Sequence, residues 1–330
     1  MIPKIDIRVP VGLPIKETAS FIADCEHIGF NGVGVHDHQH SGRDVYITLA
    51  LAALQTERLH LYPATSNPVT RHQMVLASLA HSLEEIAPGR IRLSLAPGFL
   101  SVGNIGQPKA RLSEMRDAIL NIKSLLSGES VMYGEVDGYL RNVSTQPTPV
   151  YMTAAGPKML ELAGEIADGV MAMVGLDPRI IAAATEHLSI GAARAGRNLK
   201  DIPVVFITHL AIDKDQDKAQ SWPQRYLAPK KPWLSYPSKS HHYWLRQIGI
   251  DLPDSIDPTT ISTKLSHQIC DALGLFGTPE YCADRLLQAV NESNLDHIFL
   301  FPVHTIDGGY IMPIQEKEAF RDVIFPKLYA

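Results

Sequence analysis

Cysteine is scarce in this sequence: only three occur among 330 residues, at positions 25, 270 and 282. An odd number of widely spaced cysteines excludes the disulfide framework that holds small secreted domains together. The sequence also lacks an apolar run of about 20 residues, which a membrane-spanning helix needs, and an apolar signal-peptide core near its start. We therefore expect a cytoplasmic protein with reduced cysteines and no membrane segment.

Positive charge is not in excess either. Lysine and arginine number 30 against 35 aspartate and glutamate residues, which gives a formal net charge of −5. Proteins that hold nucleic acid or an anionic membrane present a basic surface, so we expect neither partner here. A ligand that carries phosphate would need a local binding site.

The motifs of several common enzyme classes are missing. No G-x-G-x-x-G follows the first apolar run, so the sequence gives no sign of a dinucleotide-binding Rossmann unit. It contains neither a Walker loop nor a G-x-S-x-G elbow. Paired carboxylates, which a glycosidase needs, are absent from the ends of the predicted strands, where only Asp37 and Asp213 occur. Nucleophilic hydrolysis therefore has little support.

What the sequence does contain is a regular alternation of apolar runs with helical patterns. The eight runs cover residues 4–9, 32–37, 58–65, 90–97, 149–155, 169–175, 202–212 and 295–303. Strands that alternate with helices indicate βαβ units and a parallel sheet. Eight such units predict an α/β fold, a (β/α)8 TIM barrel formed by a single domain over residues 1–330, in preference to an open doubly wound sheet. The ligand site of such a barrel lies at the C-terminal ends of its strands.

Residues 214–275 break this rhythm. They are punctuated by proline and contain all three tryptophans of the chain, Trp222, Trp233 and Trp244. A long insertion after a barrel strand is either functional or disordered, and the aromatic content argues against disorder. We interpret the segment as an aromatic-rich lid that follows the seventh strand. Packing on the outside of the barrel or on a second subunit is the alternative.

A histidine cluster, "VHDHQH", ends the second predicted strand. Because alternate residues of a strand face the same way, the three histidines His36, His38 and His40 could share one face. Histidines at this spacing can bind a divalent metal, which raises the alternative of a metal-dependent TIM-barrel hydrolase. That site would need ligands from other strands, and only His209 and Asp307 are available. A structural histidine group is the simpler explanation.

Two further strand ends carry small or polar residues. After the third run, Thr65, Ser66 and Asn67 could hydrogen-bond a heteroaromatic ligand, although a turn with Thr70 as helix cap explains them as well. After the fourth run, Gly98 could let a ligand approach the backbone closely.

The fifth run ends in "TAAGP", residues 153–157, where small residues lead directly into a helical pattern. Bare amide groups at a helix N-terminus bind an anion such as phosphate. A tight connection with proline at the first helical position is the alternative, and these residues alone support both equally.

Taken together, two segments resemble the luciferase-like oxidoreductases, and within them the branch related to methylenetetrahydromethanopterin reductase. The first is "RDVYITLALAALQTERLHLYPATSNPVTRHQMVLASLAHSLEEIAPGRIRLSLAPG" and the second is "AAGPKMLELAGEIADGV". The match runs from about Ile5 to Gly175 and resumes at "FGTPEYCADRLLQAV". It does not extend to the insertion.

The resemblance implies a barrel that binds a flavin or a deazaflavin (coenzyme F-420) at its C-terminal mouth. By this match the phosphate would lie on the turn formed by Thr153, Ala154, Ala155, Gly156 and Pro157. Bare amides following Ala155 would reach it.

The same match places other residues beside the cofactor ring. Asp37 and His38 would line the ring, and the peptide from Ala64 to Thr65 would be a non-prolyl cis bond. Phe99, next to Gly98, stands where relatives that oxidise sugar phosphates have an acid, so it would form an apolar wall.

From these observations we predict a flavin-dependent oxidoreductase, a monooxygenase that uses reduced FMN and oxygen on a small organic substrate. The alternative is hydride transfer with the deazaflavin, whose acidic tail would favour cations at the mouth: Arg43, Arg71, Lys158, Lys230 and Lys231. His38 is the predicted proton donor or acceptor, because an imidazole titrates near neutrality, and Asp37 is the second predicted catalytic residue. A cofactor-binding protein without turnover stays open. Relatives also suggest a homodimer and a flavin reductase as partner.

Overall fold

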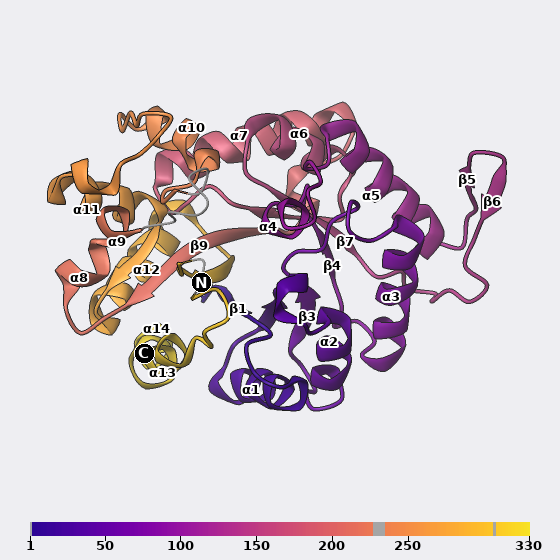
Figure 1. Ribbon diagram of the computed structural model, residues 1–330, viewed down its shortest axis with the longest axis horizontal. Coiled ribbons are helices and arrows are strands. Elements are labelled where there is room, and N and C mark those ends of the chain that lie inside the picture. Colours follow the sequence, from indigo (N-terminus) through magenta and orange to yellow (C-terminus); the bar gives the residue numbers. More distant parts are fainter. Residues whose placement is uncertain (1, 227–234, 306–307) are drawn as a thin grey trace.

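The computed structural model describes residues 2–226, 235–305 and 308–330. Within these ranges eight parallel strands form a nearly closed barrel, in the order β3-β2-β1-β11-β9-β8-β7-β4 (Figure 1). Isolated parallel bridges, one between Leu61 and Ile91 and one between Ser66 and Leu95, link its two ends. The predicted (β/α)8 barrel is confirmed. Its strands are β1 (Lys4–Val9), β2 (Gly32–Val35), β3 (His60–Pro63), β4 (Leu93–Leu95), β7 (Val150–Ala154), β8 (Gly169–Ala172), β9 (Val204–Ile212) and β11 (His297–Pro302).

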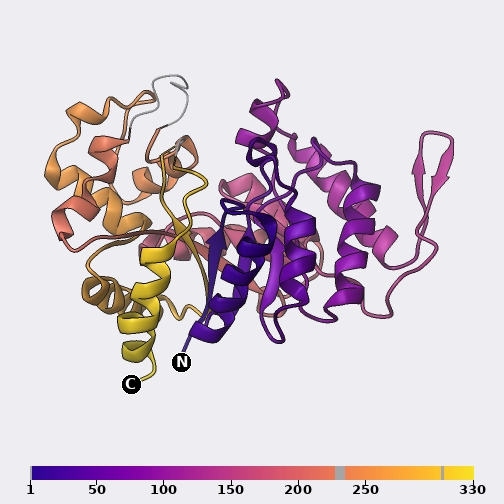
Figure 2. The same cartoon turned by 60° about the horizontal axis from the view of Figure 1, so that its bottom comes forward.

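Amphipathic helices surround the barrel. The longer ones are α1 (Ile15–Ile28), α2 (Val45–Ala53), α3 (Gln73–Ile86), α5 (Leu112–Leu126), α6 (Pro157–Ile166), α7 (Pro178–Arg194) and α12 (Pro279–Ser293). Short segments add α4 (Leu100–Gly103), α13 (Ile314–Ala319), α14 (Phe325–Leu328), η1 (Gln39–Ser41), η2 (Leu199–Asp201) and the π-helical η4 (Phe320–Ile324). In α5 the buried residues recur at helical spacing, as Met115, Ile119, Ile122 and Leu126 show. Figure 2 shows both termini at one end of the molecule and α4 with the insertion at the other.

Strand β1 shows how the sequence sets inside and outside. Ile5, Ile7 and Val9 belong to the large apolar core shared with the surrounding helices. Asp6 and Arg8 alternate with them, are buried, and therefore point into the barrel. Charged side chains inside a barrel need charged or polar partners, and the partners of Asp6 differ from those of Arg8.

The interior at the N-terminal end of the strands is closed by a polar cluster around Asp6. The Tyr62 hydroxyl donates to Asp6 Oδ2 at 2.7 Å, with Arg92 Nη1 at 3.2 Å and His297 Nε2 at 2.9 Å. Burial acts to raise the pKa of Asp6, but His297 and Arg92 keep that pKa below its ordinary value. Above the cluster lie large apolar side chains, among them Tyr151, Met171, Ile207 and Phe299. This end of the barrel therefore has a structural role.

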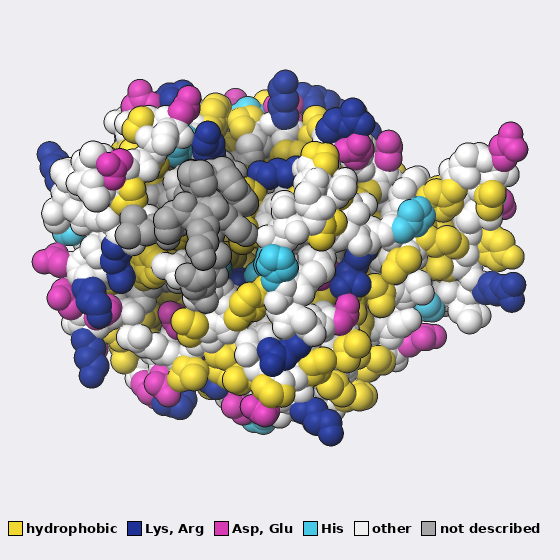
Figure 3. Space-filling model, in the orientation of Figure 1, with side chains coloured by type: hydrophobic (Ala, Val, Ile, Leu, Met, Phe, Trp, Pro, Cys, Tyr) yellow, Lys and Arg dark blue, Asp and Glu magenta, His cyan; other side chains and the backbone are white. Residues whose placement is uncertain are grey.

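Three strands were not predicted. β10 (Gly274–Gly277) pairs in parallel with the C-terminal half of β9, so the predicted insertion ends inside a strand. Its four residues, GLFG, are too short a run to separate from the preceding helix by pattern. β5 (Val131–Tyr133) and β6 (Val136–Gly138) form a hairpin that projects from the body in Figure 1. Figure 3 shows apolar side chains on this arm, where Met132 and Val136 are exposed.

The insertion folds into α8 (Gln216–Gln220), α9 (Trp222–Arg225), α10 (Lys239–Gln247), η3 (Pro258–Thr260) and α11 (Thr263–Leu273). Tyr236, Leu245 and Leu273 form a second apolar core with Phe276 of β10. Trp233 lies outside the described residues. The predicted movement of the insertion as a lid stays a prediction.

All three cysteines are free, as expected, and they are also buried. No helix of the described part of the chain is long and apolar enough to cross a membrane.

Candidate functional site

The second strand end divides its side chains between two environments. The rings of His36 and His38 stack with centroids 4.9 Å apart, so these two histidines do share a face. The third histidine does not follow this pattern. β2 ends at Val35, and His40 lies in η1, exposed, with its ring edge against His38. The prediction that His40 shares that face was wrong, because the chain has left the strand before it.

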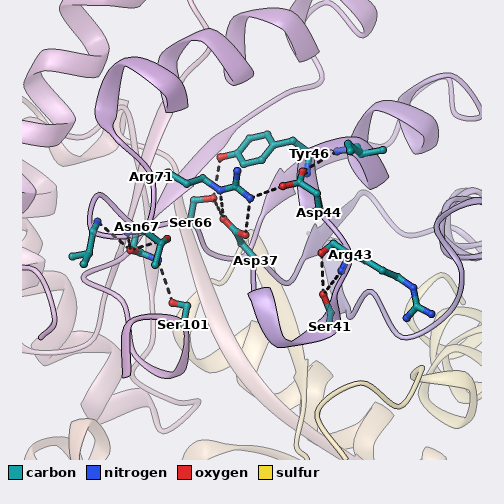
Figure 4. Close-up of polar contacts among 12 residues, drawn as sticks. Asp37, Ser41, Arg43, Asp44, Tyr46, Ser66, Asn67, Arg71 and Ser101 are labelled. Carbon is teal, nitrogen blue, oxygen red and sulfur yellow. Dashed lines mark hydrogen bonds and ion pairs between the residues drawn. The ribbon is translucent and has the colours of Figure 1, made fainter. Parts of the chain in front are cut away.

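Asp37 points the other way, into an ion-pair network that Figure 4 shows. Arg71 holds both carboxylate oxygens, with Nε 3.1 Å from Oδ2 and Nη2 3.2 Å from Oδ1. Arg71 Nη2 also donates to Asp44 at 2.7 Å, and its guanidinium lies over the ring of Tyr46. The Ser66 hydroxyl donates to Asp37 at 2.5 Å. Asp37 therefore joins the ends of β2 and β3, and it positions this rim through contacts with protein groups.

The polar residues after β3 are likewise engaged by protein groups. Ser66 is fully buried, and the Tyr46 hydroxyl lies 2.9 Å from its Oγ. Asn67 Oδ1 accepts from the Thr70 amide at 2.8 Å, which makes Asn67 the residue that fixes this turn. Helix α3 is capped by His72, so the prediction of Thr70 as cap was wrong. The peptide between Ala64 and Thr65 is cis, as predicted.

His38 is held from both ring nitrogens. Asn104 Nδ2 lies 2.9 Å from Nε2, and the Tyr310 hydroxyl is within hydrogen-bonding distance of Nδ1. Because an amide nitrogen can only donate, Nε2 accepts, and in the neutral ring Nδ1 carries the proton. Burial raises the pKa of Tyr310, which keeps it a neutral phenol. His38 thus has a fixed tautomer beside a neutral hydroxyl, an arrangement suited to moving one proton.

The fourth strand end gives the mouth an apolar residue. Gly98 has φ +88°, and a Cβ there would lie 2.5 Å from Val102 Cγ1, so glycine is required for two independent reasons. Phe99 follows it at 41% exposure, and Lys109 Nζ lies 4.3 Å from the centre of its ring. That Phe99 forms an apolar wall beside the ring stays a prediction.

The turn after β7 leaves a helix N-terminus open. Gly156 precedes α6 with no side-chain cap, Pro157 takes the first turn, and a Cβ on Gly156 would meet nothing within 4 Å. In contrast, Asp177 caps α7 and Thr278 caps α12. The amides of the first turn of α6 thus have no intrahelical acceptor, and no side chain of the described residues caps this helix. Such an N-terminus fits an anion.

The neighbours of this turn come from β4 and from the insertion. Thr153 Oγ1 lies 3.2 Å from Ser94 Oγ, and Ala154 is buried in the apolar core. The indole of Trp244, itself fully buried, donates to the Ala155 carbonyl. The insertion therefore rests on the predicted phosphate turn.

Arg8 is the residue that the sequence reasoning missed. It is 3% exposed, and Nη2 donates to His36 Nδ1 at 2.9 Å and to the Gly309 carbonyl at 3.1 Å. Its guanidinium also lies over the ring of Phe301, 5.0 Å from the centroid. Burial lowers the pKa of Arg8 to about 10, which leaves it charged at neutral pH. The only signal in the sequence was its place in β1, one of two charges alternating with apolar residues.

Further histidines line the same wall but form no metal centre in the described residues. His209 Nδ1 is 2.9 Å from the Tyr236 hydroxyl, with the ring of His241 next to it. Burial lowers the pKa of His304 to about 4 and holds the pKa of His209 well below its ordinary value. Neutral imidazoles could bind a metal, yet no group of three or more potential ligands converges in residues 2–226, 235–305 and 308–330. Asp307, a predicted ligand, lies outside these residues.

Comparisons with known proteins show the family. A family model described as luciferase-like monooxygenase matches residues 4–297. The 5,10-methylenetetrahydromethanopterin reductase of Methanolobus tindarius is 33% identical over 83% of this chain and 86% of its own length.

Solved structures add the fold. The coenzyme F420 dependent tetrahydromethanopterin reductase of Methanopyrus kandleri superposes with a TM-score of 0.72 at 22% identity, covering 99% of this chain and 100% of that one. A Baeyer–Villiger monooxygenase from Pseudomonas putida in complex with FMN gives a TM-score of 0.68 at 16% identity, covering 99% of each chain.

Proposed function

The chain belongs to the luciferase-like oxidoreductase family, and from that premise we propose that it is a deazaflavin (coenzyme F420)-dependent oxidoreductase of a small organic substrate. The observation that carries the proposal is the uncapped start of α6 at Gly156, which offers bare amides at the barrel mouth. Residues 153–157 would hold the cofactor phosphate, and the ring would extend towards the cis peptide after β3.

The sequence alone narrowly favoured FMN. Two observations favour the deazaflavin instead. The relative at 33% identity is a methylenetetrahydromethanopterin reductase, and the solved reductase of Methanopyrus kandleri is described as coenzyme F420 dependent. The FMN-bound monooxygenase is only 16% identical. Lys158 is exposed in the first turn of α6, where it could meet the acidic tail that extends beyond the phosphate. Arg71 cannot serve this purpose because Asp37 and Asp44 engage it. Lys230 and Lys231, two further predicted cations, lie outside the described residues.

When bound, the deazaflavin supplies hydride transfer without oxygen. The residues of this chain would transfer the proton, exclude water and position the reacting groups. His38, fixed by Asn104 and Tyr310, would give or take the proton that accompanies the hydride. Phe99 would exclude water from one side of the ring. Asp37 would act as a positioning residue through Arg71. The homodimer and the reductase partner stay predictions.

The test is a titration of apo protein with oxidised F420 and, separately, with FMN, read by the quenching of cofactor fluorescence. We expect micromolar binding of F420 and at least tenfold weaker binding of FMN. Tight binding of FMN with none of F420 would restore the monooxygenase, and stoichiometric zinc without either cofactor would support the hydrolase.

A further inference from the structure

The wall of the barrel formed by β1 and β11 carries a charge that the proposed function has not used. Arg8 has no Asp or Glu within ion-pair distance in residues 2–226, 235–305 and 308–330, and its Nε–H is buried without an acceptor there. Its two protein acceptors, His36 and a backbone carbonyl, are neutral. A buried guanidinium is stable when a negative group accompanies it, and the described part of the chain supplies no such group to Arg8.

A cavity of about 190 Å³ opens beside this guanidinium. Besides Arg8 its wall includes Trp222, Val303, His304, Met312 and Pro313. At about 30 Å³ for each water in the liquid, the volume equals roughly six waters, which suits a small molecule. One cation in a mostly apolar wall is the composition that receives an anionic head with an apolar body.

The position of the cavity separates it from the predicted phosphate turn. Around the barrel β1 and β11 lie across from β7, whether one counts through β2, β3 and β4 or through β9 and β8. The turn before α6 therefore stands on the far wall. His36 touches Arg8, and its ring stacks on that of His38, so His36 links the arginine of the cavity to the proposed proton-transfer residue. Under the proposed function this wall would face the substrate.

We propose that Arg8 is the anchor for a carboxylate of the substrate, and that the substrate is a small monocarboxylic acid with an apolar body. This proposal rests on the proposed function. The planar guanidinium suits a carboxylate by charge and by geometry. His304 and the apolar residues of the cavity would contact the body, and His38 would face its reacting carbon.

One acidic residue, Glu316, also lines the cavity. Burial raises its pKa, so it loses its negative charge more readily than an ordinary carboxylic acid. It still supplies a matched control. Replacing it by glutamine should leave carboxylate binding unchanged or tighter, whereas a cation site would lose affinity.

The experiment measures binding to the full chain by calorimetry, with and without F420. The probes are isovalerate, hexanoate and benzoate, the amide of each acid, and inorganic phosphate. We expect at least one carboxylate to bind while its amide and phosphate do not, binding to fall at least tenfold in Arg8→Gln, and Arg8→Lys to retain part of it. Three carboxylates that all fail to bind, equal binding of acid and amide, or equal binding to Arg8→Gln would overturn the proposal.

A structural role for Arg8 predicts a different result. If the guanidinium only holds His36 and Gly309, Arg8→Met should lower the melting temperature. If it waits for a ligand, Arg8→Met should melt at or above the wild-type temperature, because an uncompensated buried charge has been removed. Should Arg8→Gln weaken F420 itself tenfold, the arginine serves the cofactor and the anchor is refuted while the proposed function stands. Carboxylate binding without F420 binding would refute the function and keep the anchor.

Discussion

Two arginines at the mouth of the same barrel have opposite surroundings. Arg71, on the rim between β2 and β3, pairs with Asp37 and Asp44. Burial alone would lower the pKa of Arg71, but the two carboxylates raise it. Arg8, on the wall of β1, has no such partner in the described residues, and burial lowers its pKa. A charged side chain that is paired within the chain has a structural role, whereas a charged side chain without such a partner is available to a ligand.

Replacing Arg71 by methionine breaks the paired side of this comparison. Among the residues that the structure describes, Asp37, which is 4% exposed, would keep only Ser66 as a side-chain hydrogen-bond partner. Removing one member of a buried ion pair leaves an uncompensated charge, so we expect the free energy of unfolding to fall by about 3 kcal/mol. Urea denaturation measures it, with Arg8→Met as the matched variant. Equal losses in both variants would end the distinction between the two arginines.

Lowering the pH should destabilise the protein through His304, on the barrel wall that carries Arg8. The pKa of His304 is about 4 in the folded protein, against an ordinary value of 6.5, so between these values the unfolded chain binds the extra proton. Stability contributed by the neutral ring is therefore present above pH 6.5 and lost as the pH falls to 4, by on the order of 3 kcal/mol.

The measurement is the melting temperature across this range for wild type and His304→Gln. The variant should show a shallower decline, and His40→Gln, which changes an exposed ring, should follow the wild type. Parallel curves for His304→Gln and wild type would show that the folded protein does not hold the ring of His304 neutral.

The start of α6 extends the comparison, because no side chain of the described residues caps it. Gly156→Asp places a negative charge on the bare amides, and the open space around Gly156 accommodates it. We expect cofactor affinity to fall about tenfold by charge repulsion, with the apo melting temperature unchanged or higher, since aspartate is a good helix cap. Asn198→Asp, at the exposed cap of η2, adds the same charge away from the mouth. An affinity that stays the same in Gly156→Asp would reduce the turn to a connection.

The smallest expected effect concerns Asp44, the more exposed of the two carboxylates that pair with Arg71. Asp44 is 35% exposed in its side chain, and Arg71 keeps Asp37 when Asp44 is changed. We expect Asp44→Asn to lower the free energy of unfolding by less than about 1 kcal/mol, as asparagine retains the cap of α2. A loss as large as that of Arg71→Met would mean that Asp44, and not Asp37, carries the network.

The sequence predicted the parts of this arrangement that are local. Alternating apolar residues located the eight barrel strands, and the family match located the cis peptide and the turn before α6. β10 was missed because four residues carry too little pattern. The partners of the site were missed because folding brings them from afar: Arg71 lies 34 positions from Asp37, and Tyr310 lies 272 positions from His38. Contacts between residues so far apart in the sequence leave no periodic pattern that would predict them.

The most direct test of the account is to purify the protein from a host that makes both F420 and FMN, and to record the absorbance spectrum and mass of the bound ligand. We predict F420 at near one equivalent per chain, lost in Gly156→Asp and kept in Asn198→Asp. Bound FMN, or zinc with no organic cofactor, would contradict the account.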